Sequence, residues 1–201
     1  MDFTYTETQD MIRDTLSRFL SDTYDFETRQ KFINSDSGRD PAIWTALAQE
    51  LGMLGAPFAE EHGGLGGGAL ENAIVMEELG KVIGIEPYLP TVVIAGSALK
   101  AVGGAQADAM IPEIIAGKAV IAFAYAEPQG RYDLANLRTN AKKDGAGYVL
   151  SGHKSVVYAA PWATHLLVTA RTGGATRDRE GVSLFLIDAN IRASGKSLLA
   201  D

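Results

Sequence analysis

The spacing of the apolar residues changes once along this chain, near Gly117-Lys118. Upstream of that point the apolar side chains recur at the spacing of one helix face. Downstream they gather in short runs bounded by glycine and polar residues, which is typical of strands. We therefore expect an α+β chain, with an all-helical domain over residues 1–117 followed by a β-domain over residues 118–201.

Two of the expected helices begin with capping residues. Thr6, with Gln9 three residues later, has the pattern of a capping box, and Asp40 before Pro41 is an N-cap followed by proline in the first turn. The expected apolar stripes are Met11, Ile12, Leu16, Phe19 and Leu20 on the first helix, and Ile43, Trp44, Leu47 and Leu51 on the second, before Gly52 ends it. Further helices are expected at about 70–82, with Ile74, Val75, Met76 and Leu79 buried, at 90–102 and at 107–115.

The second half predicts strands over residues 119–126, 137–142, 147–158 (broken at Gly152), 165–170 and 182–187. Asp144-Gly145 has the chemistry of a hairpin turn, so the second and third strands are expected to pair antiparallel. The segment 173–181 is polar and rich in glycine, and we expect a loop there.

Composition argues against several classes of function. The chain has no cysteine, which excludes disulfides, thiolate metal ligands and a cysteine nucleophile, and its three histidines lack the spacing of metal ligands. No apolar run reaches the roughly 18 residues of a membrane helix, and the first residues lack the features of a signal peptide, so a cytoplasmic protein without a membrane span is predicted. Residues 1–118 carry eight Lys and Arg against 18 Asp and Glu, which argues against nucleic-acid binding.

The glycine-rich segment 60–68 lies between two expected helices. Gly64-x-Gly66 does not follow a strand, so this segment is not a dinucleotide-binding motif. Its glycines are explained by a tight connection between the helices. In the helix that follows, ordinary core is the more frequent role for Leu70, Ile74 and Met76.

The segment 122–134 runs from an apolar strand into a Glu127-Pro128 turn and then a loop with Gly130, Arg131 and Asp133. Turn chemistry alone accounts for such a segment. It nevertheless resembles the flavin-facing loop of acyl-CoA dehydrogenases, which usually reads Thr-Glu-Pro-x-Ala-Gly-Ser-Asp. Three further segments resemble the same family in the same order, and they lie at 44–68, at 76–81 and from 144 to 188.

This resemblance implies the family's N-terminal helical domain and its antiparallel, barrel-like or sandwich middle domain, with the C-terminal helical bundle missing. It implies FAD as cofactor, an acyl-CoA substrate in a pocket lined by the 60–68 loop and the next helix, and an electron-transfer flavoprotein as acceptor. The residues that it places at the cofactor are Phe123, Tyr125, Ala126, Arg131, Tyr132, Val156 and Tyr158.

Five of these positions depart from the family pattern, and four of them, Ala126, Tyr132, Val156 and Tyr158, lose a hydroxyl or a ring that would contact flavin or phosphate. Ala126 replaces the usual Thr, Arg131-Tyr132 replaces Gly-Ser, and Val156 and Tyr158 replace the Trp and Thr that contact the flavin ring. Backbone amides at Tyr125 and Ala126, the Tyr158 phenol and an Arg131–pyrophosphate pair are expected to remain as contacts. For Arg131, a salt bridge to Asp133 or a solvated side chain is an equally good interpretation.

The pattern Ala-Glu-Pro-x-x-Arg-Tyr-Asp-Leu, with Tyr24-Asp25-Phe26-Glu27-x-Arg29 near the start, resembles the small subunits of two-component enzymes such as pimeloyl-CoA dehydrogenase. The resemblance implies α,β-dehydrogenation of an acyl-CoA to a trans-2-enoyl-CoA. It places the catalytic glutamate beyond Asp201, so no residue of this chain is assigned as base, and Glu127 is interpreted as a structural turn carboxylate.

Two other functions stay open. One is a non-catalytic, flavin-poor partner of a large active subunit, which flavin content with and without that partner distinguishes. The other is a flavin oxidase or monooxygenase on the same fold, which oxygen reactivity distinguishes. The partner is therefore expected to be a large subunit or a second copy of the chain, in a heteromer such as a heterotetramer.

Overall fold

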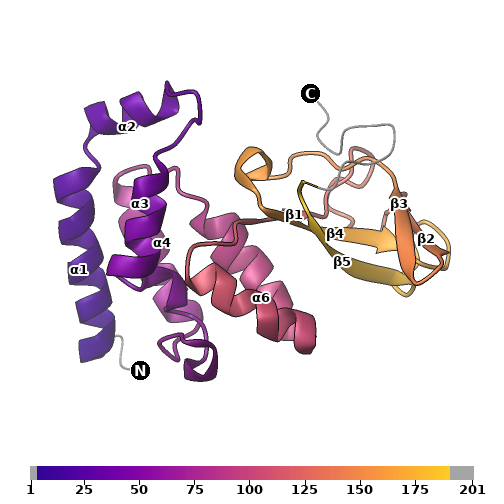
Figure 1. Cartoon of the computed structure of the whole chain (residues 1–201), viewed down its shortest axis with the longest axis horizontal. Coiled ribbons are helices and arrows are strands. Elements are labelled where there is room, and N and C mark those ends of the chain that lie inside the picture. Colours follow the sequence, from indigo (N-terminus) through magenta and orange to yellow (C-terminus); the bar gives the residue numbers. More distant parts are fainter. Residues whose placement is uncertain (1–3, 191–201) are drawn as a thin grey trace. The chain divides into compact units, whose positions relative to one another are not determined.

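A computed structural model describes residues 4–190 of the chain. It divides into two compact units, Met1–Ala119 and Val120–Asp201, each of which is described by itself. The described helices of regular α type lie in the first unit and the strands in the second (Figure 1). The expected α+β class is therefore confirmed.

The first unit is built from α-helices joined by short π- and 3-10 segments. The α-helices are α1 (Glu7–Thr23), α2 (Phe26–Ile33), α3 (Pro41–Thr45), α4 (Ala69–Lys81), α5 (Gly96–Val102) and α6 (Ala105–Ile115). The π-helices are η1 (Ala46–Glu50), which continues α3, and η4 (Leu89–Ala95), which leads into α5, and the 3-10 turns are η2 (Met53–Gly55) and η3 (Glu60–His62).

The capping box predicted at the start of α1 is present. The Thr6 hydroxyl accepts from the Gln9 amide, and the Gln9 side chain accepts from the Thr6 amide. Ile12, Leu16 and Leu20 form the buried stripe of this helix, which packs against α4. Met11 is 63% exposed, so its expected burial is wrong. It follows Asp10 on the outer side of the helix, one residue off the stripe.

The second predicted helix start is also present. The Asp40 carboxylate accepts from the Ala42 amide, with Pro41 in the first turn. Trp44 is buried on this helix and its indole N–H donates to the Gly117 carbonyl at 3.0 Å. Gly52 then adopts a left-handed conformation that ends the segment, in line with the expected stop.

The glycines of the 60–68 segment serve close packing. A Cβ on Gly64 would lie 2.2 Å from the Phe58 carbonyl oxygen, and one on Gly67 would lie 2.5 Å from the Ala56 carbonyl oxygen. The amides of Gly66 and Gly67 donate to those same two carbonyls. The segment therefore lies directly on the preceding turn, where only glycine fits.

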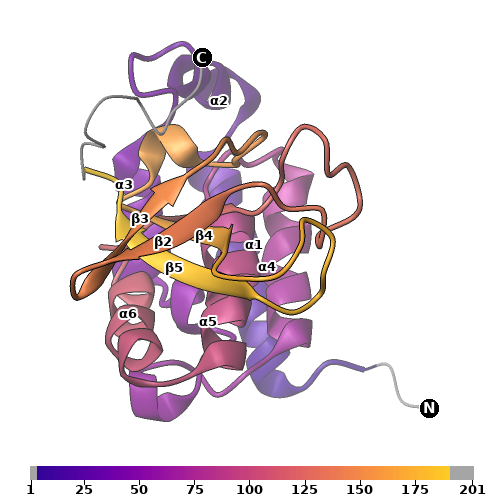
Figure 2. The ribbon, with the colours of Figure 1, turned by 90° about the vertical axis from the view of Figure 1, so that its right-hand side faces the viewer.

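The second unit contains one five-stranded sheet (Figure 2). Its strands are β1 (Ile121–Ala124), β2 (Asn140–Asp144), β3 (Gly147–Ser151), β4 (His165–Arg171) and β5 (Val182–Asp188). The core beneath it is small, because it is formed by Ala122, Ala124, Leu166 and Val168 with partly buried neighbours. All five strands lie within or close to the runs expected from the sequence.

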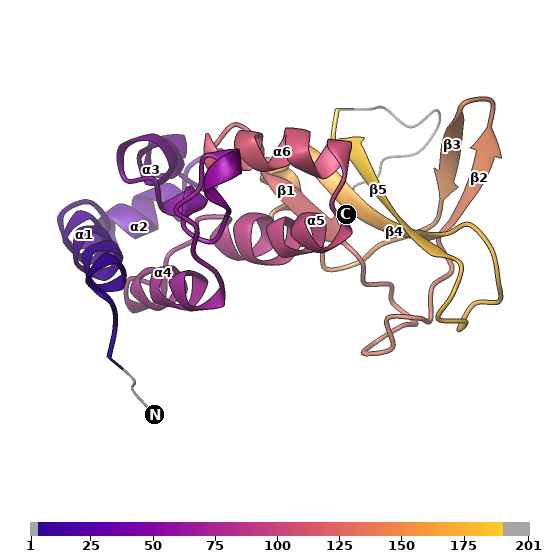
Figure 3. The ribbon, with the colours of Figure 1, turned by 90° about the horizontal axis from the view of Figure 1, so that it is seen from below.

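The sheet is mixed, so the expected wholly antiparallel pairing is wrong in part. β2–β3 and β4–β5 are antiparallel, whereas β1 and β4 run parallel. The reason is the long crossover from β1 to β4, which contains the whole β2–β3 hairpin and returns the chain in the same direction. The hairpin joins β4 at a single residue pair, Asn140 with Arg171, and diverges beyond it (Figure 3). Within residues 4–190 no helix has both the length and the apolar character needed to cross a membrane.

Candidate functional site

The candidate cofactor loop leaves the sheet at a gap along one edge of β4. β1 pairs with His165–Val168 of β4, and β2 reaches the same strand only at Arg171. Between these two pairings the chain turns outward at Tyr125–Glu127. The loop that follows is thus anchored at both ends to one strand.

The Glu127 carboxylate holds the base of this loop. It is 5% exposed, and it accepts hydrogen bonds from the Arg138 amide at 2.7 Å, the Thr139 amide at 2.9 Å and the Gln129 side chain at 2.6 Å. Burial alone raises the pKa of Glu127, but the donors at Thr139, Arg138 and Gln129 outweigh burial and lower the pKa to about 2. Glu127 is therefore an anion at every physiological pH.

Lys154 is the cationic partner of Glu127. Its Nζ lies 3.0 Å from Glu127 Oε1, and it also donates to the Thr169 hydroxyl at 2.9 Å. Burial lowers the pKa of Lys154, and the Glu127 carboxylate opposes that shift. This ion pair fills the gap between β1 and β2 on the edge of β4.

The loop itself is closed by its own hydrogen bonds. Gln129 and Asn136 bond reciprocally through side-chain amides and backbone carbonyls, and the Asp133 amide donates to Gly130. Asp133 Oδ1 accepts from the Ala135 amide at 3.1 Å, so the carboxylate is used inside the loop. The tip that results carries Arg131 and Tyr132.

Both tip residues face solvent. Arg131 has a positive φ of 49°, and Tyr132 is fully exposed. Within residues 4–190, neither side chain makes a hydrogen bond or ion pair with another predicted cofactor residue, and the alternative of an Arg131–Asp133 salt bridge is not observed. Arg131 is exposed at the tip of the loop, and its assignment to a pyrophosphate stays a prediction.

The other predicted cofactor residues form a group around the end of β1. The rings of Phe123 and Tyr125 lie 5.3 Å apart, and the Ala126 carbonyl accepts from the Ser155 amide at 3.0 Å. This bond brings the chain before Val156 beside the loop. Val156 and Tyr158 are both exposed, and Val156 has a positive φ of 53°, which is strained for a β-branched residue.

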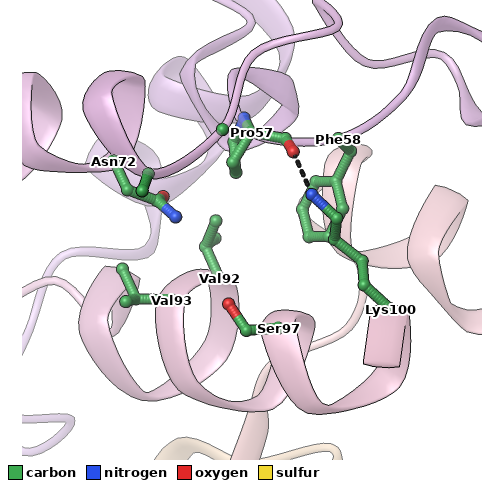
Figure 4. A pocket seen from close by; sticks show the side chains of 9 residues that line it. Pro57, Phe58, Asn72, Val92, Val93, Ser97 and Lys100 are labelled. Carbon is green, nitrogen blue, oxygen red and sulfur yellow. Dashed lines mark hydrogen bonds between the residues drawn. The ribbon is translucent and has the colours of Figure 1, made fainter. Parts of the chain in front are cut away.

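A separate cavity of about 210 Å³ lies in the helical unit (Figure 4). It is lined by Pro57, Phe58, Gly68, Ala69, Asn72, Val92, Val93, Ser97 and Lys100. Lys100 donates to the Pro57 backbone carbonyl at 2.6 Å, and the side-chain Oδ1 of Asn72 accepts from the buried Tyr88 hydroxyl at 3.0 Å. Its wall is mostly apolar, with polar groups at three places.

Gly68 of the 60–68 loop and Ala69 and Asn72 of the next helix belong to this lining, but the sequence did not single out these residues. Leu70, Ile74 and Met76 do not line the cavity, since Ile74 is core, Met76 is half-buried and Leu70 is 47% exposed. The helix contributes instead through Ala69 and Asn72. The helical phase of α4 would have placed Asn72 one turn before Met76, but nothing in the sequence singled out an asparagine.

Comparison with known proteins identifies the family. The family model of the acyl-CoA dehydrogenase N-terminal domain matches residues 6–118, which is more than half of the chain. The chain belongs to the acyl-CoA dehydrogenase family. The model of the family's middle domain matches residues 122–197. The resemblance seen in the sequence is therefore confirmed at family level.

Individual relatives agree. Acyl-CoA dehydrogenase FadE29 of Mycobacterium tuberculosis is 34% identical over 177 residues, covering 81% of this chain and 45% of FadE29. The ChsE4-ChsE5 complex from Mycobacterium tuberculosis superimposes with a TM-score of 0.80 at 27% identity, covering 94% of this chain and 49% of that chain. The FAD complex of PigA superimposes with a TM-score of 0.81 at 28% identity, covering 94% of this chain and 49% of that chain. The chain spans about half the length of each of these relatives.

Proposed function

We propose that this chain is the N-terminal and middle part of an FAD-dependent acyl-CoA dehydrogenase small subunit that takes part in α,β-dehydrogenation of an acyl-CoA to a trans-2-enoyl-CoA. The observation that supports the proposal most directly is the backbone arrangement just after the end of β1. There the Ala126 carbonyl is held by Ser155, and within residues 4–190 the Ala126 N–H has no acceptor. A free amide in a fixed position is what an isoalloxazine edge requires.

The residues present fit FAD in part. The amides at Tyr125 and Ala126 would bond the ring, and Arg131 at the loop tip would pair with the pyrophosphate. Val156 supplies no aromatic face and Ala126 no hydroxyl. When bound, FAD supplies the acceptor for the hydride that leaves the substrate β-carbon. The described residues of this chain would only bind and orient it.

The acyl chain is assigned to the cavity of the helical unit. Its apolar wall from Phe58, Val92 and Val93 suits a hydrocarbon chain. No carboxylate lines the cavity among the described residues, so the α-proton has no base there. Glu127 is excluded as that base, because its pKa of about 2 and its four donors leave it little affinity for a proton.

The proposal places the domains at 1–117 and 118–201 and the protein in the cytoplasm. A large subunit or a second copy, in a heteromer such as a heterotetramer, would complete the site, with an electron-transfer flavoprotein as acceptor. One structural relative is titled the ChsE4-ChsE5 complex, another carries the paired name Tcur3481-Tcur3483, and a third is titled an electron transferring flavoprotein. The exposed Val156 and Tyr158 favour one alternative, a flavin-poor partner subunit without catalytic function.

The test is flavin content. The purified chain should be colourless, whereas co-expression with an adjacent large subunit should give a yellow heteromer that forms enoyl-CoA. In that heteromer, Arg131→Ala should weaken FAD or acyl-CoA binding by about 1.5–3 kcal/mol. Arg138→Ala is the matched control, because Arg138 is an exposed arginine in the same segment.

Each outcome decides between functions. A heteromer whose flavin is bound by the large subunit alone would support the flavin-poor partner. A yellow, active assembly of this chain without a partner would contradict the two-component assignment. Equal affinities in Arg131→Ala and wild type would remove Arg131 from the site.

A further inference from the structure

Arg171, the last residue of β4, is a buried cation, and within residues 4–190 the hydrogen bonds of its side chain all go to backbone carbonyls. It is 7% exposed. Nε donates to Leu137 at 3.1 Å; Nη1 donates to Gly173 and Glu180 at 3.4 and 3.1 Å; Nη2 donates to Ala135, Thr176 and Asp178 at 2.7, 2.9 and 2.7 Å. A guanidinium has five N–H groups, so the three acceptors at Nη2 share two hydrogens.

These carbonyls come from two segments that are distant in sequence. Ala135 and Leu137 belong to the end of the candidate cofactor loop, and the other four belong to the loop between β4 and β5. A further bond, from the Leu137 amide to the Thr176 carbonyl at 2.9 Å, joins the same two segments. One side chain thus fixes the second loop against the first.

The Glu127 carboxylate, which has the opposite charge, forms hydrogen bonds to the same segment, residues 135–139. Its carboxylate takes the amides of Arg138 and Thr139, directly after the carbonyls that Arg171 takes at Ala135 and Leu137. The anion therefore accepts from N–H groups, and the cation donates to C=O groups, of one short segment, residues 135–139, which we call the strap. All of these hydrogen bonds go to the backbone, so they do not depend on the side chains of the strap.

We propose that Arg171 is a positioning residue for ligand binding at the tip of the loop, and that it acts with Glu127 as a two-sided clamp on residues 135–139. This inference rests on the proposed function, in which the tip residue Arg131 meets a pyrophosphate. The turn at the tip is closed by the Asp133 amide, which donates to Gly130, but within residues 4–190 the Arg131 side chain forms no hydrogen bond or ion pair, so the position of the turn relative to the sheet is set at the base of the loop. Preorganisation of this kind lowers the cost of ordering the loop on binding.

The clamp needs the planar fork of arginine. Lysine keeps the charge but has a single nitrogen with three donors, which cannot serve the six carbonyls that Arg171 reaches through three nitrogens. Arg171→Lys should therefore fail to restore what Arg171→Met loses. This separates positioning from a requirement for buried charge alone.

The experiment measures amide hydrogen exchange and pyrophosphate binding by NMR on the full chain. In Arg171→Lys and Arg171→Met, the amides of Gly130, Asp133 and Leu137 should exchange at least tenfold faster, while the amides of α1 change less than twofold. Arg138→Lys is the control and should change neither set. If Arg171→Met fails to fold, Arg171→Lys and Glu127→Gln carry the comparison.

Inorganic pyrophosphate then tests positioning. Its affinity for the chain should fall at least threefold in Arg171→Lys. Adding Arg131→Ala to that variant should reduce the pyrophosphate affinity by a much smaller factor than Arg131→Ala does in wild type. If the two substitutions reduce pyrophosphate affinity by independent factors that multiply, Arg171 does not act through Arg131. Unchanged amide exchange in the Arg171 variants, or wild-type behaviour of Arg171→Lys, would also overturn the proposal. If pyrophosphate does not bind wild type, the Arg131 contact of the proposed function is overturned, whereas the clamp is still decided by the exchange rates.

Discussion

Two glutamates, one in each unit, are buried to the same degree and have opposite acidities. Glu86 in the helical unit is 7% exposed and Glu127 in the sheet unit is 5% exposed. The pKa of Glu86 is raised to about 7 by burial, which Asp40 reinforces and Arg39 only partly offsets. The pKa of Glu127 is lowered to about 2, because its hydrogen-bond donors outweigh burial.

The difference lies in the donors. Within residues 4–190 no donor reaches either carboxylate oxygen of Glu86, whereas four reach Glu127. Burial therefore does not decide the charge of a carboxylate in this protein; the backbone amides of a neighbouring strap do. The region that supplies these amides is the candidate cofactor loop. The helical region around Glu86 has no such arrangement.

The largest expected effect comes from removing the anion that is well paired. Glu127→Ala leaves Lys154 buried without its partner and frees two amides, so the sheet unit should lose about 3–5 kcal/mol of unfolding free energy. Urea titration followed by residue-resolved NMR measures this. Glu77→Ala, which breaks the exposed pair with Lys81, is the control and should cost less than about 1 kcal/mol.

Lys154→Met tests whether the cation or the backbone amides keep Glu127 ionised. It removes the cation but leaves Glu127 with its donors at Gln129, Arg138 and Thr139, so its cost should be clearly smaller than that of Glu127→Ala. An equal or larger loss would mean that Lys154, and not the set of backbone amides, keeps Glu127 ionised.

The unfolding free energies of the two units should change with pH in opposite directions. The pKa of Glu127 is lowered in the folded state, so its contribution is present above its unfolded value near 4.5 and is lost as pH falls toward 2. The pKa of Glu86 is raised, so its contribution is present below 4.5 and is lost as pH rises through about 7. Each change is about 3 kcal/mol at 1.36 kcal/mol per pKa unit. Urea titrations at several pH values would contradict this if both units showed the same slope.

Glu86→Gln should abolish the pH dependence of the helical unit. At pH 8 the variant should be more stable than wild type by about 1–3 kcal/mol, because a buried ionised carboxylate is replaced by a neutral amide. At pH 4 the two should be similar, since Glu86 is then protonated. Glu50→Gln, at an exposed position on η1, is the control and should leave the free energy unchanged at both values. A Glu86→Gln variant that is less stable at pH 8 would show that Arg39 depends on the carboxylate.

Much of the fold follows from local sequence signals. The Thr6–Gln9 box, the Asp40-Pro41 start and the Asp144-Gly145 turn each act through neighbouring residues, and all three were predicted correctly. The parallel pairing of β1 with β4 could not be derived in this way. It depends on where a chain returns after forty residues, which hydrophobic spacing does not encode.

In the candidate site, too, local sequence patterns identified some residues and could not identify others. The loop was found from its family pattern, and Glu127 was interpreted as structural, in agreement with its hydrogen bonds. Arg171 was missed, because an arginine at the end of a strand is ordinarily solvent-exposed and its acceptors are backbone carbonyls, which every residue has. The assignment of the seven cofactor residues stays a prediction.

The smallest expected effect concerns the connection that carries Glu86. Ile83 follows α4 with a φ of 52° and its side chain is 62% exposed, so this β-branched residue bears left-handed strain without burying much surface in return. Its carbonyl accepts from Arg29 Nε at 2.7 Å, a bond that glycine keeps. Ile83→Gly should therefore stabilise the helical unit by about 1 kcal/mol, the relief of strain less the added entropy of the unfolded chain. Val82→Gly, at a neighbouring φ of −100°, should instead destabilise it by a similar amount. If both glycine variants are destabilised alike in urea, Ile83 is not strained.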